Sequence, residues 1–311
     1  MTKSQFRKVA VIGTINCDTV VRPDGTLCRG YGGILYSLIV LSRLSDNEVE
    51  IWPVVNVGRD HDKQIRARIS ELLKIRSDSM RTVSSPNNHC LLRYENASDK
   101  TEKLSGWVGG VGREQLRKIV DSEYILVNYI SGSDISTANL MWLQSQTHAK
   151  IYIDFHSRTL GRRADGTRYL RRPRDWQKTV LCADFLQMNE VEFKLLARQL
   201  PDRSRCQRFM ATEMNKGARA LLVTLGSRGC IVCYRRGTSI VVQQIMPPAT
   251  NKVIDTTGCG DVFAAAFLSA VISKASIPSA TAIAVRIATS RAEFASVEDL
   301  DFNRLRRQRR S

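Results

Sequence analysis

The stretch with the clearest chemical content is VIDTTGCGDVFAAAF at residues 253–267, where a carboxylate follows a Gly-Cys-Gly turn. The alanine-rich apolar run after Asp261 predicts a helix that begins at this turn. The first N–H groups of a helix have no intrahelical partners, and together with the helix dipole they make an anion site. Gly258 and Gly260 have no Cβ, so their backbone can approach an anion closely.

Asp261 has two interpretations. A carboxylate at a helix start can simply stabilise that helix as a cap. A carboxylate beside a phosphate-binding turn can also take a proton from an attacking hydroxyl. Phosphoryl transfer needs little more than such a base, positioning and charge neutralisation. The stretch therefore predicts either a capped helix or a phosphoryl-transfer site.

Two further pairs combine an amide with a carboxylate. Asn189 and Glu192 are three positions apart at a predicted helix start and share a face, which suits water-mediated Mg²⁺ binding near phosphates or a simple N-cap. Asn16 and Asp18 are two positions apart at a strand end, so both point to one side. They can bind vicinal hydroxyls, although such residues are also common turn formers.

The elements that would position these residues alternate between short apolar strands and amphipathic helices. This alternation predicts an α/β fold, a mostly parallel sheet with helices on both faces, which binds ligands at the carboxyl ends of its strands. The predicted strands occupy 8–13, 49–58, 124–132, 149–155, 183–189 and 219–226, and the predicted helices 32–44, 62–75, 113–120, 139–147, 190–200 and 206–217.

Two segments interrupt this alternation. Residues 14–33 contain a Pro-Asp-Gly turn between strand-like runs, and residues 81–108 contain short strands around turn residues 95–99. Both are typical of hairpins. We expect them to form a small β lid on a single domain that spans residues 1–311.

The composition limits the class of protein. No run of about 18 apolar residues is present, so no membrane span is expected. The eight cysteines show no disulfide framework, which favours a reducing cytoplasm, and we expect Cys230 and Cys233 to be buried thiols. The net charge of +17 suits polyanionic ligands or a solvated basic surface, and arginines concentrate at 158–178 and 304–310.

DTTGCGD, at residues 255–261, resembles the C-terminal signature of the ribokinase/PfkB family of carbohydrate kinases, written D-T-x-G-A-G-D, with Cys259 in place of the usual alanine. Other family motifs are matched along the chain by VIGTINCDTV, YGGILYS, NVGRD, IDFHSR, MNEVE and LLVTLGSRG. The resemblance implies a ribokinase-like fold. It also implies that Asp261 is the general base and that N–H groups of Gly258, Cys259 and Gly260 stabilise the transferring phosphoryl group.

The resemblance also implies ligands. ATP would be the phosphoryl donor, with Mg²⁺ beside its phosphates, and family members often bind K⁺ near the first aspartate of the signature. Carried onto this sequence, the positions are Thr224, Gly226 and Gly229 for the nucleotide, Asn189 and Glu192 for its phosphates and Mg²⁺, and Asp255 and Thr257 for K⁺. Without the resemblance, residues 224–229 would be an ordinary strand-to-hairpin turn.

For the phosphoryl acceptor, the resemblance implies contacts from Asn16, Asp18, Gly32, Gly33 and Ser37. Ser37 is shorter than the asparagine usual at its position, and nearby tyrosines would suit a nucleoside base or a bulkier sugar. A sugar kinase is therefore expected, with a nucleoside kinase as the alternative. A second alternative is a non-catalytic relative that binds nucleic acid or protein through its basic surface, but the complete DTTGCGD argues against lost activity. By analogy with the family, the lid would form a homodimer.

Overall fold

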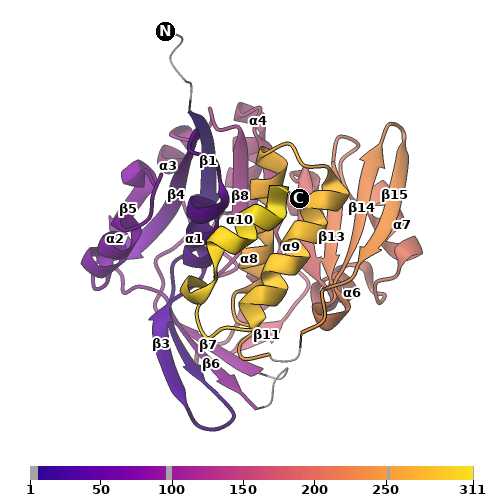
Figure 1. The fold of residues 1–311 in the computed structure, drawn as a ribbon. Helices are drawn as coiled ribbons and strands as arrows, with labels where there is room; N and C mark the ends of the chain where they lie inside the picture. Colours follow the sequence, from indigo (N-terminus) through magenta and orange to yellow (C-terminus); the bar gives the residue numbers. More distant parts are fainter. Residues whose placement is uncertain (1–5, 96–99, 251–252, 311) are drawn as a thin grey trace.

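The computed structural model describes residues 6–95, 100–250 and 253–310, and a nine-stranded sheet runs through the molecule (Figure 1). Its strands lie in the order β15-β14-β13-β12-β9-β8-β1-β4-β5. Six neighbouring pairs are parallel, and only the pairs β13–β14 and β14–β15 are antiparallel. The strands are β1 (Arg7–Ile12), β4 (Val49–Gly58), β5 (Met80–Val83), β8 (Tyr124–Asn128), β9 (Lys150–Asp154), β12 (Phe185–Asn189), β13 (Ala220–Thr224), β14 (Cys230–Arg236) and β15 (Ser239–Ile245).

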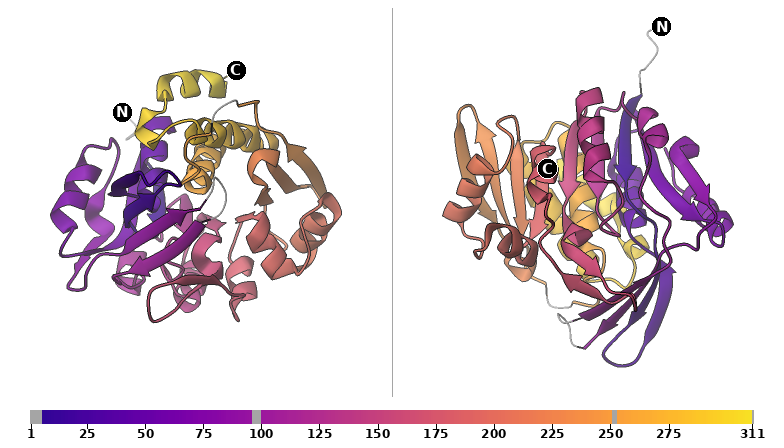
Figure 2. Two further views of the ribbon diagram at one scale, coloured as in Figure 1. Left: turned by 90° about the horizontal axis from the view of Figure 1, so that it is seen from below. Right: turned by 180° about the vertical axis from the view of Figure 1, so that it is seen from behind.

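Helices cover both faces of this sheet, because each central strand is apolar on both sides. Val9 and Val11 of β1 belong to one core, whereas Ala10 and Ile12 belong to the other. The first core lies under α1 (Ile34–Leu44), α2 (Asp62–Ser70), α8 (Cys259–Ile272), α9 (Ile277–Ala292) and α10 (Phe302–Arg310) (Figure 1). The second lies under α3 (Arg113–Arg117), α4 (Thr137–Gln146), α5 (Trp176–Leu181), α6 (Glu190–Ala197) and α7 (Arg203–Thr212), seen from behind in Figure 2.

A second, four-stranded sheet lies below the carboxyl ends of the large sheet (Figure 1). It consists of β3 (Leu27–Tyr31), β2 (Cys17–Val21), β6 (His89–Tyr94) and β7 (Lys100–Ser105), in that order. Both predicted hairpins are present, and they join through a parallel pairing of β2 with β6. Residues 96–99 of the predicted turn lie outside the described residues. Pairing of this sheet with a second copy stays a prediction.

Some elements differ from the sequence-based predictions. The helix expected at 62–75 ends at Ser70, because Lys74 takes a positive φ of 68° and Ile75 bridges back to Ile51. The basic segment contains a hairpin, β10 (Leu160–Arg162) with β11 (Arg168–Leu170), that was not predicted. Short 3-10 turns occupy η1 (Ser77–Ser79), η2 (His156–Thr159), η3 (Gly226–Arg228) and η4 (Val297–Asp299).

Two predictions from composition can be compared with the structure. All eight cysteines are free thiols, and Cys230 and Cys233 are fully buried as expected. Within the described ranges, no helix has the length and apolar character needed to cross a membrane.

Candidate active site

The glycine turn and α8 are arranged as the sequence predicts. Gly258 is the N-cap of α8 with a φ of 78°, a left-handed conformation that favours glycine. The amide of Cys259 donates to the carbonyl of Thr256 (3.2 Å), so the N–H groups of Gly258 and Gly260 are the better candidates for anion binding. Burial raises the pKa of the Cys259 thiol to about 12, which keeps this side chain neutral.

Asp261 lies in the first turn of α8 and is only 5% exposed. The side-chain amide of Asn128, at the end of β8, donates to its Oδ1 (2.9 Å) and also to Oγ of Ser37 (3.1 Å). Ser37 donates in turn to the backbone carbonyl of Asp261 (3.2 Å). Ser37 is fully buried behind the site, so it positions α8 here and does not form part of the cavity wall.

A cavity lies between the small sheet and the start of α8. Its lining residues are Asn16, Asp18, Gly33, Tyr36, Cys90, Leu92, Glu102, Ile130, His156, Ser157, Thr257, Gly258 and Asp261. The structure therefore brings the predicted base together with two of the predicted acceptor-binding side chains. Oδ1 of Asn16 is buried without a hydrogen-bond partner, as expected for an acceptor that a ligand hydroxyl would satisfy.

The two glycines before α1 leave space for groups that approach the chain closely. A Cβ on Gly32 would collide with Oδ2 of Asp18, and a Cβ on Gly33 would collide with the carbonyl of Thr14. Gly33 is also the N-cap of α1, with a φ of 65°. Gly32 therefore leaves space for the Asp18 carboxylate and Gly33 for the backbone of Thr14, and neither supplies a side-chain contact.

Two further side chains line the cavity: Glu102, which the sequence did not assign to the site, and His156 of the IDFHSR motif, for which both a ligand contact and a structural hydrogen bond were open. Glu102 comes from the lid strand β7, and His156 begins the turn after β9 with a positive φ of 26°. Among the lining residues that the structure describes, there is no Lys or Arg. The cavity is therefore acidic despite the strongly basic chain.

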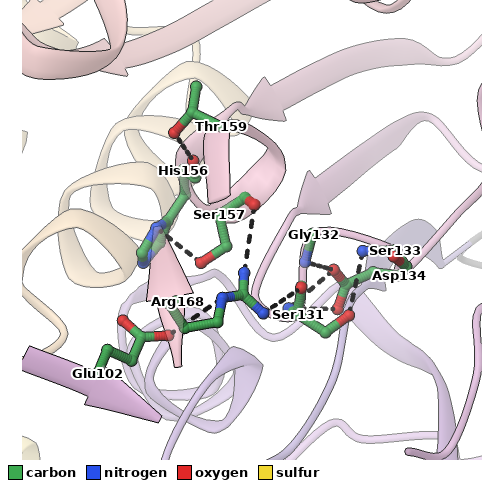
Figure 3. A network of polar contacts seen from close by, with 9 residues as sticks. All are labelled: Glu102, Ser131, Gly132, Ser133, Asp134, His156, Ser157, Thr159 and Arg168. Atoms are coloured by element: carbon green, nitrogen blue, oxygen red, sulfur yellow. Dashed lines mark hydrogen bonds and ion pairs between the residues drawn. The ribbon is translucent and has the colours of Figure 1, made fainter. Parts of the chain in front are cut away.

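A buried network supports these two side chains (Figure 3). Arg168 of β11 lies 3.8 Å from Glu102 and donates to the carbonyl of Ser131 (2.9 Å). Asp134 accepts from the amides of Ser131 and Gly132 and from Oγ1 of Thr14 (2.6 Å). Burial raises the pKa of Asp134. One arginine of the basic segment is thus used inside the protein, where it ties the lid to the loop after β8.

The Asn189–Glu192 pair forms a complete capping box. Asn189 Oδ1 accepts from the amide of Glu192 (2.9 Å), and Glu192 Oε2 accepts from the amide of Asn189 (2.9 Å). Glu192 is buried, and this burial raises its pKa to about 7. The simple capping interpretation is therefore satisfied, and the buried carboxyl is an additional property that a cap does not require.

Gln187 and Asp154, near the carboxyl ends of β12 and β9, lie beside Gly260 at the start of α8. Gln187 of β12 donates to the carbonyl of Gly260 (3.1 Å) and accepts from the hydroxyl of Tyr152 (2.6 Å). Asp154 ends β9, and its Oδ2 is buried without a partner. Burial, followed by the negative charges of Glu192 and Asp261, raises the pKa of Asp154 well above its ordinary range. The sequence-based list of site residues omitted Asp154 and Gln187.

The predicted nucleotide residues lie at the next strand end. Thr224 ends β13 directly beside Asn189 of β12. Gly226 and Gly229 follow with φ of 59° and 78°, and the first is exposed. The predicted donor residues therefore lie at the carboxyl ends of β12 and β13, and β12 contacts the start of α8 through Gln187.

The predicted K⁺ position at Asp255 and Thr257 contains a cation supplied by the chain. Nη2 of Arg291 lies 3.2 Å from Oδ2 of Asp255, and Oδ1 of Asp255 accepts from the amide of Thr257 (2.8 Å). Oγ1 of Thr257 is hydrogen-bonded to the hydroxyl of Tyr94 in the lid (2.9 Å). With these partners in place, the donor set does not fit K⁺.

The fold is that of an α/β protein with a small β lid over the carboxyl ends of its sheet. Residues 165–293 match the family model described as pfkB family carbohydrate kinase, which confirms the resemblance seen in the sequence. No curated protein matches the chain in sequence.

Solved structures resemble the chain over almost its whole length. Ribokinase from Arabidopsis thaliana, complexed with ribose and ATP, has a TM-score of 0.74 at 18% identity over 98% of this chain and 99% of its own. A pyrophosphate-dependent kinase of the ribokinase family has a TM-score of 0.76 at 18% identity over 94% and 99%. The Methanocaldococcus jannaschii nucleoside kinase has a TM-score of 0.71 at 16% identity over 98% and 99%. The chain therefore has the ribokinase fold.

Proposed function

We propose that this protein is an ATP-dependent kinase that transfers the γ-phosphate to a hydroxyl of a sugar or sugar-like molecule, with Asp261 as the general base. One observation carries this proposal: a buried carboxylate faces a lidded polar cavity from the first turn of a helix that begins with a glycine turn. A structural helix cap needs neither the cavity nor the lid.

The acceptor would be held by Asn16 and Asp18 so that one hydroxyl points at Asp261. The amide of Asn128 donates to Oδ1 of Asp261 and so fixes the orientation of the carboxylate that would accept the proton. The lid would exclude water, which otherwise competes with the acceptor for the transferred phosphate.

The transferring phosphoryl group would lie on the N–H groups of Gly258 and Gly260 at the start of α8. Donors that are fixed in advance at a helix N-terminus stabilise developing negative charge without reorganisation. Gln187 supports this arrangement, because its hydrogen bond to the carbonyl of Gly260 holds the peptide in place.

Asp154 and Glu192 would hold Mg²⁺ beside the donor phosphates. Their donor set suits the ion, since Mg²⁺ prefers oxygen ligands and usually keeps several waters. Among the described residues, no three His, Cys, Asp or Glu side chains cluster closely enough to hold a metal by themselves, so waters and phosphates would complete the shell. The bound ion would neutralise phosphate charge. The partnerless Oδ2 of Asp154 supports this assignment.

The adenosine of the donor would lie against Thr224, Gly226 and Gly229, whose strand end is next to Asn189. Since one structural neighbour is a pyrophosphate-dependent kinase, the donor must be tested directly. Turnover with ATP and none with pyrophosphate is the expected result.

The acceptor class follows from the charge of the cavity. Asp18 and Glu102 line it together with Asp261, and the described lining residues include no Lys or Arg. Carboxylates accept hydrogen bonds from hydroxyl groups and repel anions. A neutral polyhydroxylated acceptor is therefore favoured over a sugar acid or a sugar phosphate. Tyr36 in the wall keeps a nucleoside as the alternative acceptor.

The test is ADP release from Mg-ATP across pentoses, hexoses, cyclic polyols, keto-sugar acids and nucleosides. Asp261→Asn keeps the shape and removes the base, so kcat should fall by about 10²–10⁴-fold. The matched control is Asp202→Asn, which alters another aspartate at a helix start, the N-cap of α7, whose side chain accepts from the amide of Arg205 (2.7 Å). Asp202 lies outside the candidate site, so its substitution should leave kcat unchanged.

The comparison with Asp202→Asn distinguishes a general base at Asp261 from a carboxylate that only caps its helix. If Asp261→Asn and Asp202→Asn both leave turnover intact, Asp261 is a cap and the proposed mechanism is wrong. If no acceptor in the panel stimulates turnover and calorimetry detects no binding of Mg-ATP or pyrophosphate, the kinase assignment itself is wrong.

A further inference from the structure

Arg291 is the largest of the fully buried side chains in the described part of the protein, with 1% exposed. It lies in the last turn of α9, and the turn that leads into α8 lies against it. A guanidinium group keeps its charge in proteins, so burying one is costly unless oxygens surround it. The position of this charge therefore needs an explanation.

The oxygens around Arg291 belong to the start of the signature motif and to the end of α9. Nη1 donates to the backbone carbonyls of Phe294 (2.7 Å) and Asp255 (3.3 Å), and Nη2 lies 3.2 Å from Oδ2 of Asp255. The guanidinium carbon lies 5.9 Å from the centre of the Tyr36 ring. Carbonyl and carboxylate oxygens that converge on one point form the kind of shell that binds a bare cation, and here a side chain supplies the cation.

The backbone fixes the same turn to α9. The amides of Ile254 and Asp255 both donate to the carbonyl of Ala292 (2.7 and 3.2 Å). Thr257 then bonds to the other oxygen of the Asp255 carboxylate. A continuous series of contacts therefore joins Arg291 to the turn at Gly258. It passes through Asp255, one of the two residues at which K⁺ was expected.

The charge of Arg291 also acts on the start of α8. It opposes the effect of burial on the pKa of the Cys259 thiol and of the Tyr36 hydroxyl, and both groups adjoin the glycine turn. A fixed positive charge behind this turn adds to the helix dipole where an anion would bind.

We propose that Arg291 is a positioning residue that replaces a monovalent cation, so that ordering of the 255–258 turn and phosphoryl transfer by this chain need no K⁺. The second part of this inference rests on the proposed kinase activity. The first part concerns cation binding alone and is tested without activity.

The first test measures thermal unfolding of the complete chain in KCl, NaCl and tetramethylammonium chloride at equal ionic strength. A protein that binds K⁺ specifically is stabilised by it, whereas one with a built-in cation is not. We expect the same Tm in the three salts. A rise of about 3 °C or more in KCl alone would overturn the proposal. This measurement uses the unaltered chain, so it does not depend on a variant that folds.

The second test uses variants in the same salts. Arg291→Ala opens the oxygen shell and leaves Asp255 without its cation, so its Tm should gain a response to K⁺ or to millimolar guanidinium. The matched control is Arg172→Ala, because Arg172 also packs on an aromatic ring (Trp176) and donates to a carbonyl (Leu196) but lies away from the site. An Arg291→Ala response no larger than that of the control would contradict the proposal.

The third test measures turnover with and without K⁺. The unaltered enzyme should change by less than about twofold, and Arg291→Ala should lose about tenfold or more in kcat, with partial recovery in guanidinium. Arg291→Lys should retain part of the rate because it keeps the charge. K⁺-dependent turnover of the unaltered enzyme would overturn the inference and leave the kinase assignment intact. If no acceptor gives turnover, the proposed function fails, and the thermal result alone decides the role of Arg291.

Discussion

Two arginine–carboxylate pairs hold two glycine turns of this protein, and they differ mainly in burial. Arg291 and Asp255 stand behind the turn at Gly258, with side chains 1% and 13% exposed. Arg228 and Glu190 stand at the turn that contains Gly226, with side chains 58% and 33% exposed. The exposed pair has the shorter separation, 2.6 Å against 3.2 Å.

The comparison shows that the N···O distance of an ion pair is a poor guide to its contribution to stability. Water screens the exposed pair, so its contribution to stability is about 0–1 kcal/mol despite its short distance. Removal of one partner from a buried pair leaves an uncompensated charge and costs about 3–5 kcal/mol. The two turns should accordingly be held with different strength. The firmly held turn adjoins the proposed base, and the loosely held turn lies where the donor nucleotide would bind and leave.

The largest expected effect compares Arg291→Met with Arg228→Met in urea unfolding. Both variants keep the unbranched apolar stem and lose the guanidinium group with its charge. Arg291→Met should lower the free energy of unfolding by about 3–5 kcal/mol, whereas Arg228→Met should change it by less than about 1 kcal/mol. Equal losses in the two variants would remove the distinction between the turns.

A double variant identifies the cause. Arg291→Met leaves the carboxylate of Asp255 buried without its cation, and Asp255→Asn removes that charge while keeping an acceptor for Thr257. The double variant should therefore be more stable than Arg291→Met alone, a coupling of about 1–3 kcal/mol. Additive losses would mean that packing, and not charge, explains the effect of Arg291.

The two turns also show what the sequence predicts well. Both were found as short glycine motifs after apolar runs, and Gly258, Gly226 and Gly229 all have the positive φ that favours glycine. Most strands of the large sheet and most helices were predicted for the same reason, because periodicity and turn residues are local signals. Two strands of that sheet were missed: β15 was not predicted, and β5 lies in the segment assigned to the lid. The fold class, a mostly parallel sheet with helices on both faces and a small β lid, was also predicted correctly.

Contacts between distant segments were not predicted. Asn128 holds Asp261 from a residue 133 positions away, and nothing beside Asn128 marks it except a polar side chain at a strand end. Arg291 lies 36 positions from Asp255 and looks like an ordinary helical arginine in the sequence. Such residues meet only through the arrangement of strands and helices in the folded protein.

The basic segment at 158–178 is another case in which the sequence did not predict contacts between distant residues. Its composition suggested a surface for polyanions, but Arg168 is buried against Ser131, and Arg158 pairs with Asp175 (2.8 Å) and packs on Tyr129. Charge counted along a sequence does not distinguish a solvated arginine from one that is used inside the protein.

A second, intermediate effect compares Gly258→Ala with Gly226→Ala. Both positions are left-handed, so both variants should lose about 1–2 kcal/mol of stability from backbone strain. A Cβ on Gly258 would also stand 2.8 Å from the Tyr36 ring, whereas no atom lies within 4 Å of a Cβ on Gly226. The clash should add about 1–3 kcal/mol at Gly258 alone. Urea unfolding of both variants measures the difference, and identical losses would show that the Gly258 turn is not tightly packed.

The smallest effect concerns the lid contact on the buried turn. Tyr94→Phe removes the hydroxyl that bonds to Thr257 (2.9 Å) and leaves the ring in the lid core. One such hydrogen bond contributes about 1 kcal/mol, so the lid should open up to about fivefold more readily. Because closure holds the acceptor, KM for the acceptor should rise by about that factor, while kcat stays within about twofold.

Tyr169→Phe, at an exposed tyrosine of β11, is the control and should change neither constant. A fall in kcat with unchanged KM in Tyr94→Phe would mean that the hydroxyl acts on the reacting turn itself and does not merely close the lid over it.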